Sequence, residues 1–265
     1  MMQPAILSVV LALLAQTDDS SADAAARLVV MKKVLASYDV RSPEMPQTSH
    51  HFQADPVLRF TNTVGSTRDG AVFLWLGDHG RPAAAVQFSL RRDGLWFHEL
   101  SSLCERPLVA ESPRGTVWSP MRGGIEFKPL PGVPKPAGTP EQRLRQMRAL
   151  AAEFTVEDAF RHQDWQKLRM LSKPFARYGE PGSDLIDGAL FAYVVTTDPE
   201  ALLMIEARQA KDGAEWHYAF APMTIYALRG LRKSDQVWTL PFRDSNGISS
   251  NPNEPFYVKK STIEP

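Results

Sequence analysis

The feature that most constrains the fold is a series of landmarks that occurs twice along the chain in the same order. The first series runs Asp69-Gly70, Asp93-Gly94, His98, Val117-Trp118-Ser119. The second runs Asp187-Gly188, Asp212-Gly213, His217, Val237-Trp238-Thr239. Each histidine stands four residues after the glycine of its second Asp-Gly pair. Self-similarity of this kind indicates an internal duplication, so we expect two units of similar build.

A stretch with helical periodicity precedes each series. Residues 22–38 lack Pro and Gly, and their apolar residues recur on one face of a helix: Leu28, Met31, Val34, Leu35 and Tyr38. Residues 140–154 follow Thr139, which can cap a helix, and start with Pro140, which suits the first helical position. We therefore predict one helix at the start of each unit.

The remainder of each unit consists of short apolar runs separated by turn residues. Asp-Gly between two such runs is typical of a tight hairpin, so we expect neighbouring strands to pair antiparallel and all four Asp-Gly aspartates to serve as turn residues. Leu168-Arg169-Met170 is matched with Leu58-Arg59-Phe60, which leaves extra residues before Asp187. The expected fold is α+β, a tandem duplication in which each copy packs one helix on a four- to five-stranded antiparallel sheet.

Composition marks the boundaries of the two units. Prolines are concentrated in residues 129–140, PLPGVPKPAGTP, and they stiffen the chain in an extended form. We therefore assign residues 22–128 to the first unit, 129–139 to a linker and 140–243 to the second unit. From residue 244 the apolar pattern is lost, which predicts a loose C-terminal tail over residues 244–265.

Residues 1–21 are interpreted as a signal peptide and leader. An apolar run over residues 5–15 ends in a small residue, as signal peptides do, and it is shorter than the roughly 20 residues that a membrane-spanning helix needs. No Lys or Arg precedes the run, so a packing helix or an uncleaved anchor remains an alternative. We expect an exported protein, periplasmic or extracellular, whose mature chain has no transmembrane span.

Charge and cysteine content exclude several partners and sites. The 30 basic residues balance the 30 acidic residues, so no overall field attracts nucleic acid, which we exclude as a partner. Cys104 is the only cysteine, which excludes a cysteine-based metal cluster. We interpret the adjacent His50 and His51 as solvated side chains and predict no metal and no cofactor. The glycine-rich signatures of nucleotide-binding loops and of serine hydrolases do not occur in the sequence.

Several segments resemble one known protein family. They are DGALFAYVVTTDPEALLMIEAR, WHYAF and RLRQMRALAAEF, together with LRF before DGAVFLWL. In these segments, within residues 57–240, the chain is similar to a family of uncharacterised, exported bacterial proteins of similar length. The resemblance implies export, and it brings no activity, ligand or catalytic residue.

The leading site candidates are His98 and His217, because they occupy equivalent positions in the two series. A histidine can donate or accept a proton near neutral pH, and Glu99 is a candidate carboxylate, although adjacent strand residues face opposite sides. The alternative is that both histidines are structural. Weaker candidates for ligand binding are Trp96 and three loop residues: Asp78, His79 and Asp198.

These observations lead to two hypotheses about function. We expect a non-enzymatic exported protein that binds an unknown protein or small-molecule ligand in the groove between its two units, because no catalytic signature accompanies the two-unit scaffold. The alternative is an enzyme of unknown class that uses His98 or His217 with a nearby carboxylate in a cavity between helix and sheet. A pocket lined by either histidine, a carboxylate and few other polar groups would favour the enzyme, whereas a dry seam between the units with a broad exposed aromatic surface would favour the binding protein.

Overall fold

The computed structural model describes residues 21–62, 66–160, 164–243 and 248–262. The first half forms α1 (Ser21–Ala36), β1 (Asp39–Arg41), β2 (His51–Phe52), β3 (Leu58–Asn62), β4 (Thr67–Leu76), η1 (Asp78–Gly80), β5 (Pro82–Arg91), β6 (Trp96–Ser102), β7 (Val109–Ser112) and β8 (Gly115–Trp118). After β9 (Lys128–Pro129), the second half forms α2 (Pro140–Ala152), β10 (Phe154–Ala159), β11 (Gln166–Lys167), β12 (Arg169–Met170), β13 (Ala176–Tyr178), β14 (Leu185–Val195), β15 (Asp198–Ala210), β16 (Gly213–Pro222), β17 (Ala227–Arg232) and β18 (Asp235–Leu240). The chain continues through η3 (Ile248–Ser250) and β19 (Phe256–Ser261).

Two six-stranded antiparallel sheets form the centre of the molecule. One has the order β19-β6-β5-β4-β2, with β3 also paired to β4, and the other has the order β12-β14-β15-β16-β9, with β13 also paired to β14. Two smaller sheets have the orders β1-β7-β8 and β11-β10-β17-β18. The predicted antiparallel pairing of neighbouring strands is confirmed, and Gly94 (φ 85°) and Gly213 (φ 102°) supply the positive φ that the turns after β5 and β15 require.

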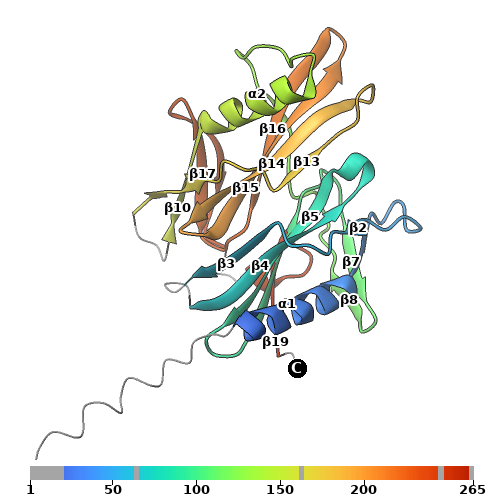
Figure 1. Cartoon of the computed structure of the whole chain (residues 1–265), viewed down its shortest axis with the longest axis vertical. Coiled ribbons are helices and arrows are strands. Elements are labelled where there is room, and N and C mark those ends of the chain that lie inside the picture. Colours follow the sequence, from blue (N-terminus) through green and yellow to red (C-terminus); the bar gives the residue numbers. More distant parts are fainter. Residues whose placement is uncertain (1–20, 63–65, 161–163, 244–247, 263–265) are drawn as a thin grey trace, which may run out of the picture.

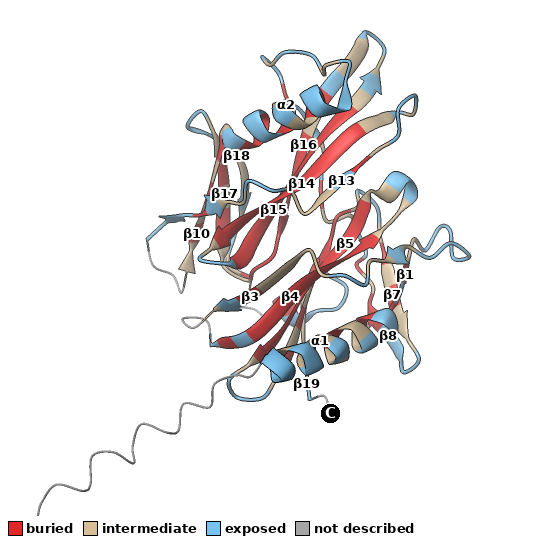
Figure 2. Cartoon of the chain, in the orientation of Figure 1, coloured by how far each residue is buried: buried red, intermediate tan, exposed pale blue. Residues whose placement is uncertain are grey.

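The two central sheets lie face to face (Figure 1). The apolar core between them takes Val72 and Leu74 from β4, and Leu190, Leu202 and Met204 from β14 and β15. Alternate residues of the same strands point to the outer faces, because successive side chains of a strand point to opposite sides. Both faces of these strands are therefore buried (Figure 2), which explains their nearly continuous apolar sequences.

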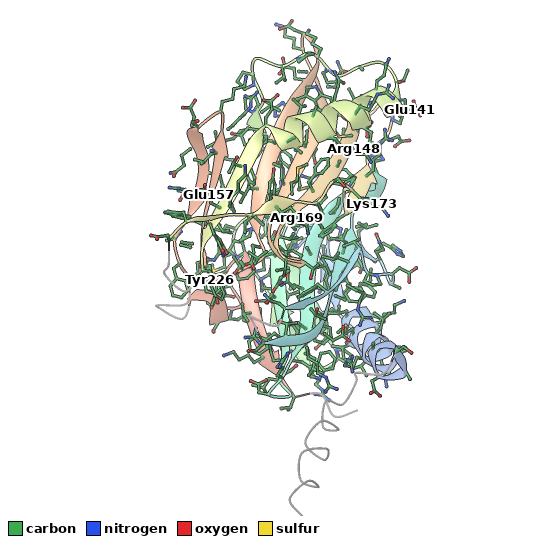
Figure 3. The ribbon with its side chains drawn as sticks, turned by 60° about the vertical axis from the view of Figure 1, so that its left-hand side comes forward. Glu141, Arg148, Glu157, Arg169, Lys173 and Tyr226 are labelled. Carbon is green, nitrogen blue, oxygen red and sulfur yellow. The ribbon has the colours of Figure 1, made fainter. Side chains whose placement is uncertain are left out.

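A helix and a small sheet cover the outer face of each central sheet. Met31 of α1 and Trp118 of β8 belong to the core on the first sheet, and Met147 of α2 belongs to the core on the second. The predicted N-terminal cap of α2 is confirmed, since the side chain of Thr139 accepts a hydrogen bond from the Gln142 amide. The charged side chains of Glu141 and Arg148 lie on the exposed side of α2 (Figure 3).

An aspartate inside a long strand of each half is bound by two arginines. Each carboxylate accepts hydrogen bonds from one arginine of the helix and one arginine of the neighbouring short strand. The contacts are those of Arg27 and Arg59 with Asp69, and of Arg143 and Arg177 with Asp187, over 2.5 to 2.8 Å. The prediction that Asp69 and Asp187 are turn residues is therefore wrong, because these carboxylates join the helix to the sheet within β4 and β14.

The glycine that follows each of these aspartates lies under an aromatic ring. A Cβ atom added at Gly70 would come within 2.4 Å of the Phe60 ring, and one added at Gly188 would come within 2.4 Å of the Tyr178 ring. Arg177-Tyr178 therefore pairs with β14 beside Gly188 in the same way that Arg59-Phe60 pairs with β4 beside Gly70. The match with Leu168-Arg169-Met170 is wrong, because β12 pairs with the other end of β14.

The expected α+β class is wrong. Strands make up 49% of the structure and helices 15%, and the larger part of the architecture is a sandwich of two sheets whose inner faces bury each other. The expectation of one helix packed on each sheet failed because each long strand has two apolar faces. The helix packs on one of them, and the opposite sheet packs on the other.

The prediction of a loose tail over residues 244–265 is also wrong for most of the residues that the structure describes in this segment. β19 pairs antiparallel with β6 in the first sheet, so the end of the chain returns from the second half to the first. Phe256 is buried, and the Trp118 indole N–H donates to the Glu254 carbonyl at 2.8 Å. The short apolar run of β19 follows a polar stretch. For this reason the sequence pattern did not indicate a strand there.

Within the described residues, none of the helices combines the length and the apolar character needed to cross a bilayer. Residues 1–20, which carry almost all of the predicted signal peptide and leader, lie outside the described part of the chain.

Candidate ligand-binding site between the two central sheets

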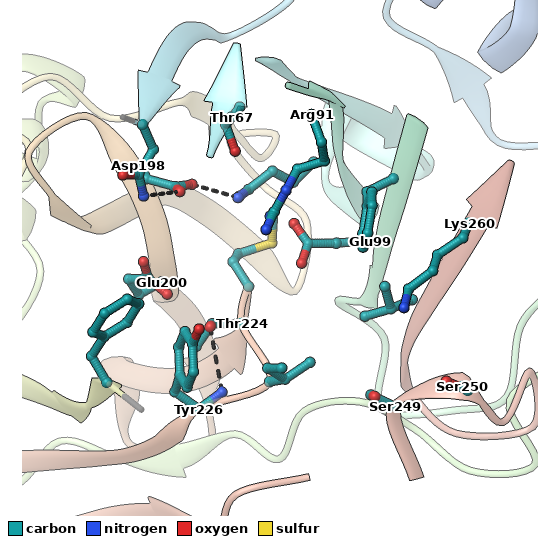
Figure 4. A pocket seen from close by; sticks show the side chains of 17 residues that line it. Thr67, Arg91, Glu99, Asp198, Glu200, Thr224, Tyr226, Ser249, Ser250 and Lys260 are labelled. Atoms are coloured by element: carbon teal, nitrogen blue, oxygen red, sulfur yellow. Dashed lines mark hydrogen bonds between the residues drawn. The ribbon is translucent and has the colours of Figure 1, made fainter. Parts of the chain in front are cut away.

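A cavity of about 160 Å³ lies at one end of the layer between the two central sheets. Strands β4, β5 and β6 supply one wall, the start of β15 and the segment after β16 supply another, and η3 and β19 complete it (Figure 4). The lining is largely polar, and its acidic, amide and basic members are Glu99, Asp198, Glu200, Asn62, Gln87, Arg91 and Lys260. Residues from both halves and from the C-terminal strand therefore meet in one cavity.

The polar residues continue the inner faces of the sheets beyond the end of the apolar core. In β5, Gln87 follows Ala85 by two residues and so shares its face, and Gln87 lies opposite Glu99 of β6. In β15, Glu200 precedes Leu202 by two residues and shares its inward face. The alternation that fills the centre of the layer with apolar groups thus places carboxyl and amide groups at its end.

Two hydrogen bonds hold Asp198 in the cavity wall. Its carboxylate accepts from the side-chain amide of Asn62 at 2.7 Å and from the side-chain amide of Gln87 at 2.6 Å. Gln87 is only 4% exposed, and its amide oxygen has no hydrogen-bond partner among the described residues. A buried acceptor without a partner is costly unless a bound molecule or water satisfies it.

The three carboxyl groups hold protons more tightly than ordinary carboxyl groups. Burial, together with repulsion from Asp198, raises the pKa of Glu99 to about 8, although the charge of Arg91 opposes this. Burial also raises the pKa of Asp198 to about 6. Burial and the charge of Asp198 place the pKa of Glu200 well above its usual value. Near neutral pH the cavity therefore contains protonated carboxyl groups, which can both donate and accept hydrogen bonds.

We predict that the raised pKa of Glu99 makes the folded state less stable as pH rises. A carboxyl group with a higher pKa in the folded state than its ordinary 4.5 stabilises the fold fully below pH 4.5, and this contribution is lost as pH rises through about 8. Glu99→Gln should remove about 2 kcal/mol of the decrease in unfolding free energy between pH 5 and pH 9. This is less than the full 1.36 kcal/mol per pKa unit, because Glu99 is partly exposed to solvent. Urea unfolding at each pH measures it.

The control for this prediction is Glu215→Gln, which changes an exposed glutamate of β16 and should keep the wild-type dependence on pH. A Glu99→Gln variant with the same pH dependence as the wild type would contradict the raised pKa.

Of the residues predicted from the sequence, Glu99 and Asp198 meet in the cavity, and the histidines do not. The side chain of His98 points to the outer face of the first sheet, where hydrogen bonds join its ring nitrogens to the Tyr38 and Ser261 hydroxyls at 3.0 and 2.9 Å. Burial, with the nearby charge of Lys259, lowers the pKa of His98 to about 3. This histidine is therefore neutral and fully engaged.

His217 lies in a different environment from His98. It pairs with Glu206 in the β15–β16 ladder and with Pro129 of β9, and burial and the charge of Arg208 lower its pKa. Neither histidine lines the cavity that contains Glu99, so the two do not open onto it together.

The remaining candidates lie away from the cavity. Trp96 is buried in the core beneath α1, where its ring centroid is 5.1 Å from that of Phe88. Asp78 and His79 lie in η1, at the opposite end of the β4–β5 hairpin, and the imidazole of His79 is 2.6 Å from the carboxylate of Glu180. Asp78 and Asp198 thus lie at opposite ends of the layer.

Sequence reasoning missed Gln87, Glu200 and Arg91. A signal for the first two was present, since Gln87 interrupts an apolar strand and Glu200 stands at the start of another. Polar residues on the inward face of a buried strand are uncommon, and they deserve consideration as site residues. Arg91, at the end of β5, carried no such signal.

Comparison with protein-family models found no match, and comparisons with curated proteins and with solved structures found none either. In the part of the chain that the structure describes, no group of three or more His, Cys, Asp or Glu residues is placed to hold a metal ion.

Proposed function

We propose that the protein binds a small polar molecule in the cavity between its two central sheets. The observation that carries this proposal is the unpartnered amide oxygen of the buried Gln87, which lines the cavity beside three carboxyl groups. An enclosed cavity of about 150 Å³ is large enough for a molecule the size of benzene, so the volume of about 160 Å³ fits a ligand of similar size.

The position of the cavity also supports binding. Pockets that hold small molecules are concave and often lie at interfaces between structural units, with a few convergent polar groups that orient the ligand. Here Glu99 comes from the first half, Asp198 and Glu200 come from the second, and Lys260 comes from the C-terminal strand. A ligand that contacts all of them would hold the three parts of the chain together.

The test is NMR titration of the protein with three small polar molecules: 1,3-propanediol, 3-aminopropanol and 3-hydroxypropanoate. We expect at least one of them to shift the signals of residues around the cavity. Ser250→Trp, which adds a large side chain at an exposed position of the cavity lining, should weaken that binding by about tenfold or more. Ser37→Trp, at an exposed position after α1, is the control and should bind as the wild type does. Absence of binding by all three molecules, or binding that Ser250→Trp leaves unchanged, would contradict the proposal.

Two further proposals concern the internal duplication of the chain and its export. We propose that its halves are copies of one unit; the matching contacts of Arg27 and Arg59 with Asp69, and of Arg143 and Arg177 with Asp187, support this.

We also propose that the protein is exported, as the apolar run of residues 5–15 predicts. N-terminal sequencing of the natural protein tests export, and Met1 at its start would contradict it.

The alternative function, an enzyme that uses His98 or His217, stays a hypothesis. The observation closest to it is that the pKa values of Glu99 and Asp198 are raised to different extents, which is the usual arrangement for an acid and a base in catalysis. The test is to replace both histidines by asparagine. An enzymatic activity that is unchanged in this variant would contradict a catalytic role for either histidine.

A further inference from the structure

Hydrogen-bond acceptors with free capacity dominate the cavity. Asp198 uses its carboxylate on Asn62 and Gln87, and the carboxyl of Glu200 is hydrogen-bonded to Thr224. By contrast, the carboxyl of Glu99 forms no hydrogen bond or ion pair with any described residue, and neither does the amide oxygen of Gln87. A molecule that satisfies the Gln87 oxygen must therefore offer an N–H or O–H donor.

The charges that line the cavity do not balance when all its carboxyl groups are ionised. Three carboxylates face the cations of Arg91 and Lys260, which leaves one negative charge in excess. Both cations lie over the ring of Phe97, with 4.9 Å from the guanidinium carbon and 5.4 Å from the ammonium nitrogen to its centroid. One additional positive charge in the cavity would complete the balance.

The opposite end of the same layer shows how this fold stabilises a buried carboxylate. Glu206 has no exposed surface, and its oxygens accept hydrogen bonds from Arg81 at 2.8 Å, Arg208 at 2.7 Å and the Tyr178 hydroxyl at 3.1 Å. No guanidinium or ammonium group of the described residues forms an ion pair with Glu99 or Glu200. The cavity thus has the carboxyl groups of such a cluster, whereas no arginine is paired with Glu99 or Glu200 among the described residues.

The lining favours an organic cation over a metal ion. The described residues provide no group of three or more side chains placed to ligate a metal, whereas Phe160 and Tyr226 line the cavity as an edge-to-face pair with ring centroids 4.8 Å apart. Aromatic faces attract organic ammonium groups through the charge distribution of the ring.

We propose that the ligand carries a protonated amine, which binds beside Glu99 and Gln87 and replaces a proton of the carboxyl cluster. This inference rests on the proposed function, whose site it shares. On binding, the O–H bond of one carboxylic acid breaks, its proton passes to the solvent, and the carboxylate that remains pairs with the ammonium group. The ammonium group keeps its own protons.

The groups around Glu99 make this exchange depend on pH. Asp198 on β15 and Arg91 on β5 act on the charge of Glu99. Glu200 on β15 is affected by Glu99, by Asp198 and by Asp158 on β10, and Lys260 on β19 lines the same cavity. Burial and Asp198 raise the pKa of Glu99 to about 8, so the carboxyl holds a proton at pH 6 and loses it above pH 8. Binding of an amine that stays charged over this range should therefore strengthen as pH rises.

The test compares 3-aminopropanol with 1,3-propanediol, which has a similar size and no charge, by calorimetric titration between pH 6 and pH 8.5. We expect the amine to bind about tenfold or more tightly than the diol at pH 8, its affinity to rise with pH, and protons to be released, as shown by titrations in two buffers of different ionisation enthalpy. Glu99→Gln should reduce affinity for the amine by about tenfold relative to affinity for the diol and abolish most of the proton release. Glu215→Gln is the matched control and should behave as the wild type.

The outcomes separate the two proposals. Equal affinity for the diol and the amine, or binding of the amine without proton release, would overturn the charged-ligand inference and leave ligand binding in the cavity intact. Binding of neither molecule, with the anionic 3-hydroxypropanoate also inactive, would overturn the proposed function itself. Calcium binding that Glu99→Gln abolishes, without amine binding, would show that the site serves a metal ion and would also overturn the inference.

Discussion

Asp187→Asn is expected to lower the free energy of unfolding by about 3 kcal/mol, because it leaves the guanidinium of Arg143 without its counter-charge. The side chain of Arg143 is only 6% exposed and that of Asp187 only 5%, so water cannot replace the lost ion pair. Arg143 keeps the carbonyl oxygens of Ala137 and Gly138 as acceptors, which limits the loss. Urea unfolding followed by circular dichroism at pH 7 measures it.

The matched control is Asp212→Asn, which changes the aspartate of an exposed Asp-Gly turn and should alter stability by less than about 0.5 kcal/mol. Asp69→Asn should resemble Asp187→Asn in direction, since Arg27 and Arg59 bind it in the same manner. If Asp187→Asn proved no more harmful than Asp212→Asn, the carboxylate would have no special part in joining the helix to the sheet.

Glu206→Ala is expected to lower the free energy of unfolding by about 3 to 5 kcal/mol, because two partly buried arginines then lose their shared carboxylate. Arg81 belongs to the first half and Glu206 to the second, so their ion pair of 2.8 Å joins the two facing sheets. Both Arg81 and Arg208 also lie over the ring of Phe127, where they would remain as neighbouring positive charges. Thermal and urea unfolding should both show the loss.

Glu105→Ala provides the control for Glu206→Ala. Glu105 lies 3.6 Å from the same Arg208 but is 47% exposed, and exposed ion pairs contribute about 1 kcal/mol at most. A Glu206→Ala protein as stable as the Glu105→Ala protein would mean that the cluster does not hold the sheets together.

Local signals were sufficient to predict the elements that depend on neighbouring residues. Thr139 and Pro140 mark the start of α2, and the Asp-Gly pairs at Asp93 and Asp212 lie in hairpin turns. The same dipeptide at Asp69 and Asp187 lies inside a strand. The sequence could not distinguish the two uses, because the arginines that bind these aspartates come from distant segments.

The facing of the two sheets depends on contacts between halves that have no local signal. The apolar character of both faces of β4 predicts that another part of the chain packs on each face. It does not identify which helix or sheet this is. For the same reason Glu99 and Asp198 were candidates on separate grounds, one as a neighbour of His98 and the other as a loop residue. Only the packing of β6 near the start of β15 places them in one cavity.

The most direct test of a protonated carboxyl cluster between two facing sheets is a carbon-13 NMR pH titration of the side-chain carboxyl groups, with Glu99 and Glu200 assigned through Glu99→Gln and Glu200→Gln. The structure predicts that Glu99 titrates near pH 8, that Asp198 titrates near pH 6 and that Glu200 titrates well above its usual range. Midpoints for all three near pH 4, where exposed carboxyl groups titrate, would contradict the cavity and the ligand chemistry that follows from it.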